Sequence, residues 1–185
     1  MYILYSYSVH RNRQSYGPSG ASVATAAPTV WPSTTTIATV PWTRNEKAAT
    51  AGVKSTSYAD NVVALAWAHD RGASEAVFAN TQGELCEGTG TNVFVVVDGR
   101  VLTPPLTSGC LAGVTRDLVI EWFGAREVDL PIDVLHEADE VFVTSSTRNV
   151  HPVVRADHRE WGGPGPISRD LQAAFDEFAA KRQDP

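Results

Sequence analysis

The residues of this sequence with the clearest chemical potential are one lysine, one glutamate and two turns rich in glycine or hydroxyl groups. Lys54 precedes a predicted helix, and a lysine whose amine is partly desolvated can attack a carbonyl and form a Schiff base. Glu87 follows an apolar stretch beside a predicted buried hairpin, where a carboxylate without a cationic partner is costly. A protonated ring nitrogen would be such a partner.

Two further turns offer hydrogen-bond donors to a phosphate group. The first is Gly113-Val114-Thr115, where a predicted helix begins and its first N–H groups are unpaired. The second is Ser145-Ser146, which follows a predicted strand. An aldehyde-binding lysine, a carboxylate for a ring nitrogen and two phosphate-binding turns are the parts that pyridoxal 5'-phosphate requires. The sequence therefore predicts this cofactor and no metal, with Lys54 as the catalytic residue and these cofactor-binding residues: Lys54, Glu87, Gly113, Val114, Thr115, Ser145 and Ser146.

Each feature also has an ordinary structural explanation. Lys54 could be a solvated surface lysine, Glu87 could pair with an arginine such as Arg116, and the two turns could be simple helix caps. The combination, rather than any single residue, favours the cofactor. A hydrolase built on Cys86 or a serine would need a paired base. None of the histidines lies in a recognisable nucleophile motif: His10, His69, His136, His151 and His158.

Composition narrows the class of protein. The formal net charge of −6 leaves no basic patch for nucleic acid or an anionic membrane. The longest apolar run is only as long as a strand, and the first ten residues lack the features of a signal peptide. Cys86 and Cys110 show no metal-ligand spacing, which favours two reduced thiols and a cytoplasmic location.

Residues 1–37 differ from the rest of the chain. They are rich in Ser, Thr, Ala, Gly and Pro and show no helical period, so we expect an irregular or truncated N-terminal segment with little packing. A short edge strand at residues 36–42 is expected to stop at Pro41. The predicted cofactor-binding domain spans residues 38–185.

The elements that must position the chemical residues follow from hydrophobic patterns and turn signals. Residues 93–97 are an unbroken apolar run, typical of a strand buried on both faces, and Asp98-Gly99 predicts a two-residue hairpin turn after it. The helix after Lys54 is expected to use Ser55, Thr56 or Ser57 as its cap. We expect Tyr58, Val62, Leu65 and Ala66 to be its buried stripe, and Leu171, Phe175 and Phe178 to face the core from the last helix.

Strands outnumber helices, and no regular alternation of the two is visible, so the expected fold class is α+β (mixed). Strands are expected at residues 76–79, 85–87, 93–97, 101–102, 126–130, 140–144, 150–155 and 159–161, and helices at 58–71, 117–123 and 167–182, with a helical turn at 132–136.

Three stretches of the sequence resemble one known family. They are VKSTSYADNVVALAWA, ASEAVFANTQGELCEGTGTNVFVVVDGRVLTPPLTSGCLAGVTR and VFVTSSTRNVHPV. Their order and wording are similar to the class IV (fold type IV) pyridoxal-phosphate aminotransferases and lyases, over residues 38–180. That family includes branched-chain aminotransferase, D-amino-acid aminotransferase and 4-amino-4-deoxychorismate lyase. The segment after Lys54 is more similar to the last two.

The resemblance implies a role for each candidate residue. Lys54 matches the Schiff-base lysine and Glu87 the glutamate at the pyridine nitrogen. Val114 and Thr115 match phosphate binders after the Leu-Ala-Gly turn, and Ser146, with its neighbour Ser145, matches a hydroxyl residue that also contacts the phosphate.

The resemblance also implies a large cofactor-binding domain with a β-rich core and packed helices, a homodimer, and an amino acid or aminodeoxychorismate-like substrate. Family members normally begin with a smaller domain that supplies an arginine to the phosphate, and nothing in residues 1–37 resembles it. The activity that the resemblance implies is transamination or the lyase reaction. The alternative is a truncated remnant that folds or dimerises without turnover.

Overall fold

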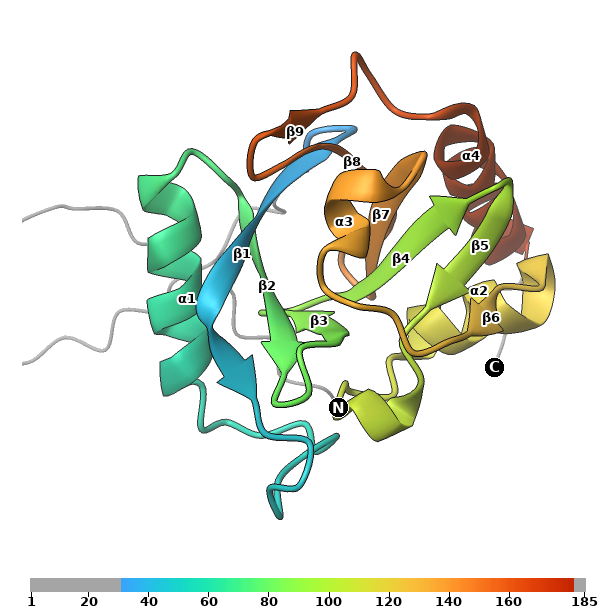
Figure 1. The fold of residues 1–185 in the computed structure, drawn as a ribbon. Helices are drawn as coiled ribbons and strands as arrows, with labels where there is room; N and C mark the ends of the chain where they lie inside the picture. The colour runs from blue at the N-terminus through green and yellow to red at the C-terminus, as the bar shows by residue number, and fades with distance from the viewer. Residues whose placement is uncertain (1–30, 182–185) are drawn as a thin grey trace, which may run out of the picture. The chain divides into compact units, whose positions relative to one another are not determined.

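The computed structural model describes residues 31–181, which contain nine strands in one sheet and four α-helices (Figure 1). The strands are β1 (Thr35–Arg44), β2 (Glu75–Asn80), β3 (Leu85–Gly88), β4 (Asn92–Val97), β5 (Arg100–Thr103), β6 (Arg126–Glu127), β7 (Glu140–Ser145), β8 (Asn149–Ala156) and β9 (Arg159–Glu160). The helices are α1 (Ala59–Asp70), α2 (Val114–Phe123), α3 (Val134–Glu137) and α4 (Pro166–Lys181), with a 3₁₀ turn η1 at Leu106–Ser108. The predicted mixed α+β class is confirmed.

Six of the strands form a closed ring. Hydrogen bonds join them in the order β3-β2-β1-β8-β7-β4, and a pairing between β3 and β4 completes the circle. That last pairing consists of one residue pair, Glu87 opposite Asn92. The remaining strands extend the sheet from β4 through β5 to β6, and β9 pairs with β8. The ring therefore closes at the glutamate that the sequence singled out.

The two faces of the ring carry separate apolar cores because side chains alternate along each strand. Val93 and Val95 of β4 point into the ring, where they pack with Leu130 and with Leu135 of α3. Phe94 and Val96 belong to the outer cluster, which includes residues of α2 and α4. This double burial explains the unbroken apolar run at 93–97 and confirms the prediction of a strand buried on both faces.

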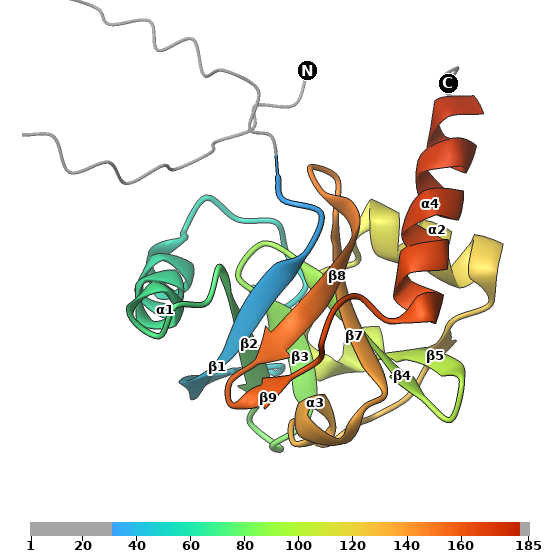
Figure 2. The same cartoon turned by 90° about the horizontal axis from the view of Figure 1, so that it is seen from above.

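Three of the helices, α1, α2 and α4, cover the outside of the ring on two opposite sides, as the view from above shows (Figure 2). On one side α1 packs on β1 and β2, and on the other α4 packs on β8 and β7 while α2 contacts β7. Among residues 31–181, no helix has both the length and the apolar character needed to cross a membrane.

The first strand differs from its prediction. β1 lies between β2 and β8 rather than at an edge, and it continues through Pro41 to Arg44. A register shift separates Thr39 from Thr43 in its pairing with β2, so Pro41 falls where no ladder partner needs its missing N–H. The strand starts at Thr35, and Ile37 is fully buried, so residues 35–37 are regular and packed, contrary to the expectation for 1–37. The same expectation for residues 1–30 lies outside the described residues.

Helix α1 has nearly the predicted ends but buries a different face. Its buried residues are Asn61, Ala64 and Ala68, whereas Tyr58 and Val62 of the predicted stripe are exposed. The prediction was wrong because it assumed that the larger apolar side chains of the helix would be the buried ones. Small alanines on the helix meet alanines on β1 and β2, which lets the helix lie close to the strands. The cap prediction was also wrong, since no side chain caps this helix.

The remaining boundaries are close to those predicted, with two differences. Helix α2 begins at Val114, three residues before the predicted start, and β6 is shorter than predicted. Phe175 of α4 is buried as expected, but Phe178 remains 40% exposed. Asp98 and Gly99 both have positive φ and join paired residues Val97 and Arg100, which confirms the two-residue turn.

Candidate active site at the seam of the ring

Asn92, the first residue of β4, brings together the strands that carry Glu87 and Ser145. It is the register partner of Glu87 on β3 and of Thr144 on β7. Ser145 and Ser146 follow Thr144 directly, so the predicted ring-nitrogen carboxylate and the serine turn flank the same residue. This part of the ring, where β3, β4 and β7 meet, is called the seam below.

Glu87 has two partners at the seam. One carboxylate oxygen accepts a hydrogen bond from the Leu111 N–H at 2.9 Å, and the other lies 3.2 Å from Nε of Arg44. Only 15% of its side chain is exposed. Burial raises the pKa of the Glu87 carboxyl, while the Leu111 N–H and the charge of Arg44 act in the opposite direction.

The arginine beside Glu87 is not the one suggested by the sequence. Arg116 is buried but bonds instead to the carboxylates of Asp117 and Glu127 and to the Pro104 carbonyl. Arg44, at the end of β1, takes its place. The Arg44 guanidinium also lies 4.1 Å from the centre of the Phe78 ring. Sequence reasoning missed Arg44 because β1 was predicted to stop before it. A strand that continued through Pro41 would have pointed to it.

The predicted phosphate turn at the start of α2 is joined to Glu87 through Leu111. The Leu111 N–H donates to Glu87, and its carbonyl accepts from the side-chain amide of Asn92 at 2.8 Å. Gly113 is the N-cap residue of α2, and no side chain caps the helix. Asn92 Oδ1 fills the space that a Cβ at Gly113 would need. Glu87 and the first turn of α2 are therefore held on two sides of one short loop.

The exposure of the turn residues suits a ligand on their outer side. Val114 is 72% exposed, and Thr115 is buried except for 6% of its surface. On the neighbouring strand, Ser145 is half-buried and its hydroxyl lies 3.2 Å from that of Thr147, while Ser146 is exposed. The structure brings these residues to the seam together with Glu87.

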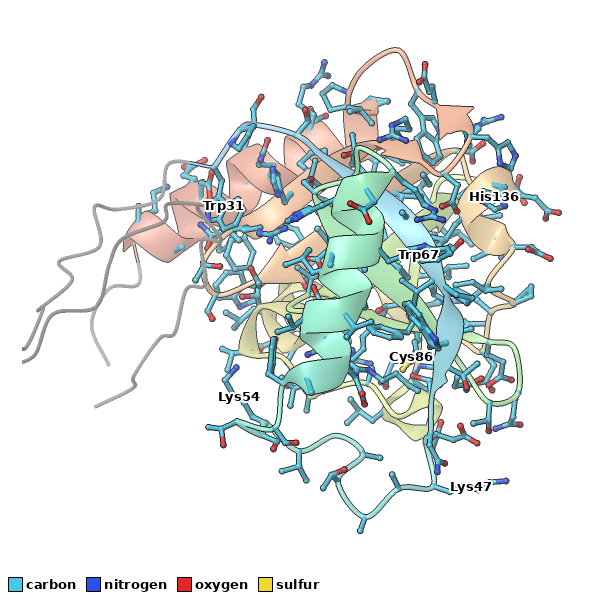
Figure 3. The ribbon with its side chains drawn as sticks, turned by 90° about the vertical axis from the view of Figure 1, so that its left-hand side faces the viewer. Trp31, Lys47, Lys54, Trp67, Cys86 and His136 are labelled. Atoms are coloured by element: carbon cyan, nitrogen blue, oxygen red, sulfur yellow. The ribbon has the colours of Figure 1, made fainter. Side chains whose placement is uncertain are left out.

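Lys54 is positioned less directly. It is exposed in the loop that leads into α1, and Figure 3 shows it at the foot of that helix, on the outer side of the molecule relative to Cys86 of β3. Within residues 31–181 no hydrogen bond or ion pair joins its amine to Glu87. The start of α1 is nevertheless tied to the seam, because the Tyr58 hydroxyl and the Asn61 amide both donate to the Thr89 carbonyl.

Unsatisfied donors at the seam match an anionic cofactor. The hydroxyls of Thr91 and Thr144 are buried without a hydrogen-bond partner in the described part of the chain, and both lie next to Asn92, in sequence or across the ladder. The uncapped first turn of α2 adds N–H groups that favour an anion. Glu87 adds an acceptor for a cationic ring nitrogen. The residues present therefore fit the parts of pyridoxal 5'-phosphate.

Other chemistry is not supported at this position. Residues 31–181 contain no group of three or more His, Cys, Asp or Glu side chains suited to a metal ion. Cys86 and Cys110 are free and buried, which confirms the predicted thiols. Burial, together with the neighbouring Glu87, raises the pKa of the Cys86 thiol to about 12, so this thiol is a poor nucleophile at neutral pH.

A pocket opens beside the seam, between the loop that follows β1 and the loop that precedes α2. Its lining includes Glu46, Gly52, Leu106, Cys110 and Ala112. Glu46 bonds to the Thr81 side chain and backbone, which lowers the pKa of its carboxyl. Two of the lining residues, Cys110 and Ala112, are the sequence neighbours of Leu111.

Comparison with known proteins matches this arrangement to one family. Residues 5–156 match the family model described as amino-transferase class IV. The chain is 34% identical over 137 residues to a probable branched-chain-amino-acid aminotransferase of Synechocystis, which covers 71% of this chain and 45% of the relative. It is 35% identical over 140 residues to a D-alanine aminotransferase of Staphylococcus haemolyticus, covering 70% of this chain and 48% of the relative.

Solved structures give the same result. A branched-chain amino acid aminotransferase from Thermobaculum terrenum in its PLP form superposes with a TM-score of 0.74 at 32% identity, over 80% of this chain and 52% of that one. A putative 4-amino-4-deoxychorismate lyase from Legionella pneumophila gives 0.76 at 25% identity, over 80% and 57%. The chain thus spans about half the length of the relatives that it matches.

Proposed function

Because the chain belongs to the class IV aminotransferase family, we propose that it binds pyridoxal 5'-phosphate at the seam and acts on an amino acid or an aminodeoxychorismate-like substrate. The single observation that carries this proposal is the pair of hydrogen bonds made by the backbone of Leu111. Its two backbone groups bond to Glu87 and Asn92, so a buried carboxylate and an uncapped helix start sit on one loop. A cofactor with a basic ring nitrogen and a phosphate needs both.

Each candidate residue has a defined task in the proposal. Lys54 would hold the aldehyde of the cofactor through its amine and, once the amino group of the substrate has displaced that amine, would move a proton at Nζ to and from the α-carbon. Glu87 would keep the ring nitrogen protonated, and the charge of Arg44 favours the ionised carboxylate against the effect of burial, which raises its pKa. Gly113, Val114 and Thr115 offer donors to the phosphate from one side.

Ser145 and Ser146 offer donors to the same phosphate from the β7 side. When bound, the cofactor supplies an electron sink for the bond that breaks at the α-carbon. The Lys54 side chain is exposed, so its amine is open to a cofactor that arrives from solvent.

The relatives leave the outcome of the reaction open between transamination and the lyase reaction, since they include proteins named for both. The alternative expected from the sequence, a chain that folds or dimerises without turnover, stays a second proposal for a chain that spans about half the length of the relatives that it matches. The predicted homodimer and cytoplasmic location remain proposals. Light scattering after size-exclusion chromatography tests the first, and fractionation of the source cells tests the second.

The decisive experiment uses the small number of lysines in the sequence, which are Lys47, Lys54 and Lys181. The chain is mixed with millimolar pyridoxal 5'-phosphate and reduced with borohydride, and its peptides are analysed by mass spectrometry. We expect a yellow protein labelled at Lys54. Lys54→Ala should lose the label completely, and Lys47→Ala, which removes another exposed lysine on the same loop, should keep it.

Two results would overturn parts of the proposal. A colourless chain that borohydride does not label would exclude cofactor binding at Lys54. A labelled chain that transfers no amino group and releases no pyruvate would support the alternative without turnover. Such a chain would still bind the cofactor, so the two results are distinct.

A further inference from the structure

A second glutamate, Glu75, is more deeply buried than Glu87. It contacts the turn between β3 and β4 and the turn between β7 and β8. It is the first residue of β2 and is 1% exposed. A carboxylate buried to this extent is costly unless charges and donors surround it. The groups that bond to Glu75 therefore indicate which parts of the fold this buried charge connects.

One carboxylate oxygen of Glu75 holds the turn between β3 and β4. It accepts from the Thr89 N–H at 3.1 Å and also from the Thr89 hydroxyl. The Thr89 carbonyl in turn accepts from Tyr58 and Asn61 at the start of α1. Thr89 therefore links Glu75 to the helix that follows the Lys54 loop.

The other carboxylate oxygen of Glu75 holds the turn between β7 and β8. It lies 3.2 Å from the guanidinium of Arg148, which is itself mostly buried. Arg148 closes the turn that contains Ser145 and Ser146, since its N–H bonds to the Ser145 carbonyl. Its guanidinium also lies 3.9 Å from the centre of the Trp31 ring, which leaves it little freedom to turn away.

A close backbone approach also points to Glu75. A Cβ at Gly88 would overlap the Thr91 hydroxyl and lie 3.4 Å from Cδ of Glu75. The turn between β3 and β4 is thus packed directly on this carboxylate, one residue after Glu87.

From these contacts we propose that Glu75 is a positioning residue of the cofactor site, which ties the Thr89 turn to the Ser145–Ser146 turn through Arg148. The inference rests on the proposed function. One buried charge sets the distance between the turn beside Glu87 and the serine turn that offers donors to the phosphate. Glu75 itself does not contact the ligand.

The proposal predicts a specific change in ligand preference. Glu75→Gln keeps an oxygen that can accept from Thr89 but places an amide NH₂ against the Arg148 guanidinium, where two donors face each other. The serine turn should then lose the ion pair between Arg148 and residue 75, while the Thr89 turn keeps most of its hydrogen bonds to that residue. We expect the preference for pyridoxal 5'-phosphate over pyridoxal, which lacks the phosphate, to fall about tenfold, the size of one lost charge-assisted hydrogen bond.

The same variants can be tested without any ligand. Amide hydrogen exchange should become faster in peptides covering residues 144–149 in Glu75→Gln and in Arg148→Gln, the second variant if the first does not fold. Glu75→Ala should add faster exchange in residues 88–91. The matched control is Glu140→Gln, because Glu140 is another buried carboxylate, 6% exposed, that bonds only at the start of α4.

The outcomes separate a positioning role from a purely structural one. If Glu75→Gln weakens both ligands equally, or leaves exchange at residues 144–149 unchanged, Glu75 only stabilises the fold and the inference fails. If Glu140→Gln changes the preference as much as Glu75→Gln, the effect is general and the inference also fails. If the unsubstituted chain takes up neither ligand, the proposed function fails, and hydrogen exchange alone decides the coupling of the two turns.

Discussion

The starts of helices α2 and α4 lie at opposite ends of the strands β4 and β7 and are built in similar ways. Each helix follows a glycine, and a polar side chain from the adjacent strand fills the space where that glycine lacks a Cβ. At α4 the pair is Gly165 and Glu140, and at α2 it is Gly113 and Asn92. Asn92 begins β4, whereas Glu140 begins β7 and pairs with Val96 near the other end of β4.

The difference lies in what the strand residue does for the helix. Glu140 accepts hydrogen bonds from the N–H groups of Ile167 at 2.9 Å and Ser168 at 2.7 Å, so a charge of the protein satisfies the start of α4. Asn92 turns its amide to the Leu111 carbonyl, and no side chain caps α2. One helix start is complete within the chain. The other has donors left for an anion, which is how a binding site differs from an ordinary cap.

The largest expected effects come from adding one methyl group at each glycine. Gly113→Ala should push against Asn92 and move the first turn of α2, with a loss of about 1–3 kcal/mol in unfolding free energy. Cofactor affinity should fall at least tenfold as well, because the phosphate donors move. Urea denaturation and absorbance titration with pyridoxal 5'-phosphate measure the two effects.

The matched variant at the other helix should separate these effects. Gly165→Ala pushes against Glu140 and should cost a similar amount of stability, about 1–3 kcal/mol. Its cofactor affinity should stay within twofold of the unsubstituted chain, about 0.4 kcal/mol. Equal losses of affinity in both variants would show that the two helix starts do not differ in function.

A smaller effect is expected when the charge at α4 is removed. Glu140→Gln retains an acceptor but loses the charge that faces two N–H groups, so unfolding free energy should fall by about 1–2 kcal/mol. Calorimetry measures the change. Exchange of the Ile167 and Ser168 amides should become faster, and unchanged exchange there would mean that the cap does not stabilise α4.

Removing the Thr115 hydroxyl in α2 should have the opposite effect, lowering cofactor affinity while leaving stability nearly unchanged. Thr115 is 6% exposed, and Thr115→Val keeps its shape, so stability should change by less than about 0.5 kcal/mol. Affinity for pyridoxal 5'-phosphate should fall about tenfold or more, the size of one hydrogen bond to a charged group. Pyridoxal without the phosphate should bind as before. A variant that loses stability but keeps its affinity would assign Thr115 to the fold.

The same contrast explains what could be predicted from the sequence. The buried strand at 93–97 and the Asp98-Gly99 turn follow from local patterns that any fold must respect, and both are present. Glu87 was found because a carboxylate beside a buried hairpin needs a partner. These predictions depend only on neighbours along the chain.

The residues that were missed depend on the order of the strands in the sheet. Arg44 meets Glu87, and Arg148 meets Glu75, across strands that are distant in sequence, and no local pattern encodes either pairing. The buried face of α1 was mispredicted for a related reason. How closely a helix approaches a sheet depends on the residues it meets, and here alanines face alanines.

The smallest expected effect concerns the charge of Glu87 and its dependence on pH. Burial raises the pKa of this carboxyl above its ordinary value of 4.5. A carboxyl with a raised pKa in the folded state binds its proton more tightly when folded, so protonation stabilises the fold. This contribution is fully present below pH 4.5 and is lost as pH rises through the raised pKa. The charge of Glu87 at the seam therefore lowers the stability of the fold, whereas the charge of Glu140 at the start of α4 raises it.

Glu87→Gln tests this directly because glutamine is neutral at every pH. Below pH 4.5 the variant and the unsubstituted chain should have similar unfolding free energies, and as pH rises to neutrality the variant should become the more stable of the two. Urea denaturation at a series of pH values measures the difference. If the unsubstituted chain instead gains on the variant as pH rises, the Arg44 ion pair outweighs burial. In that case the pKa of Glu87 is lowered, and the carboxylate stabilises the fold before any cofactor reaches it.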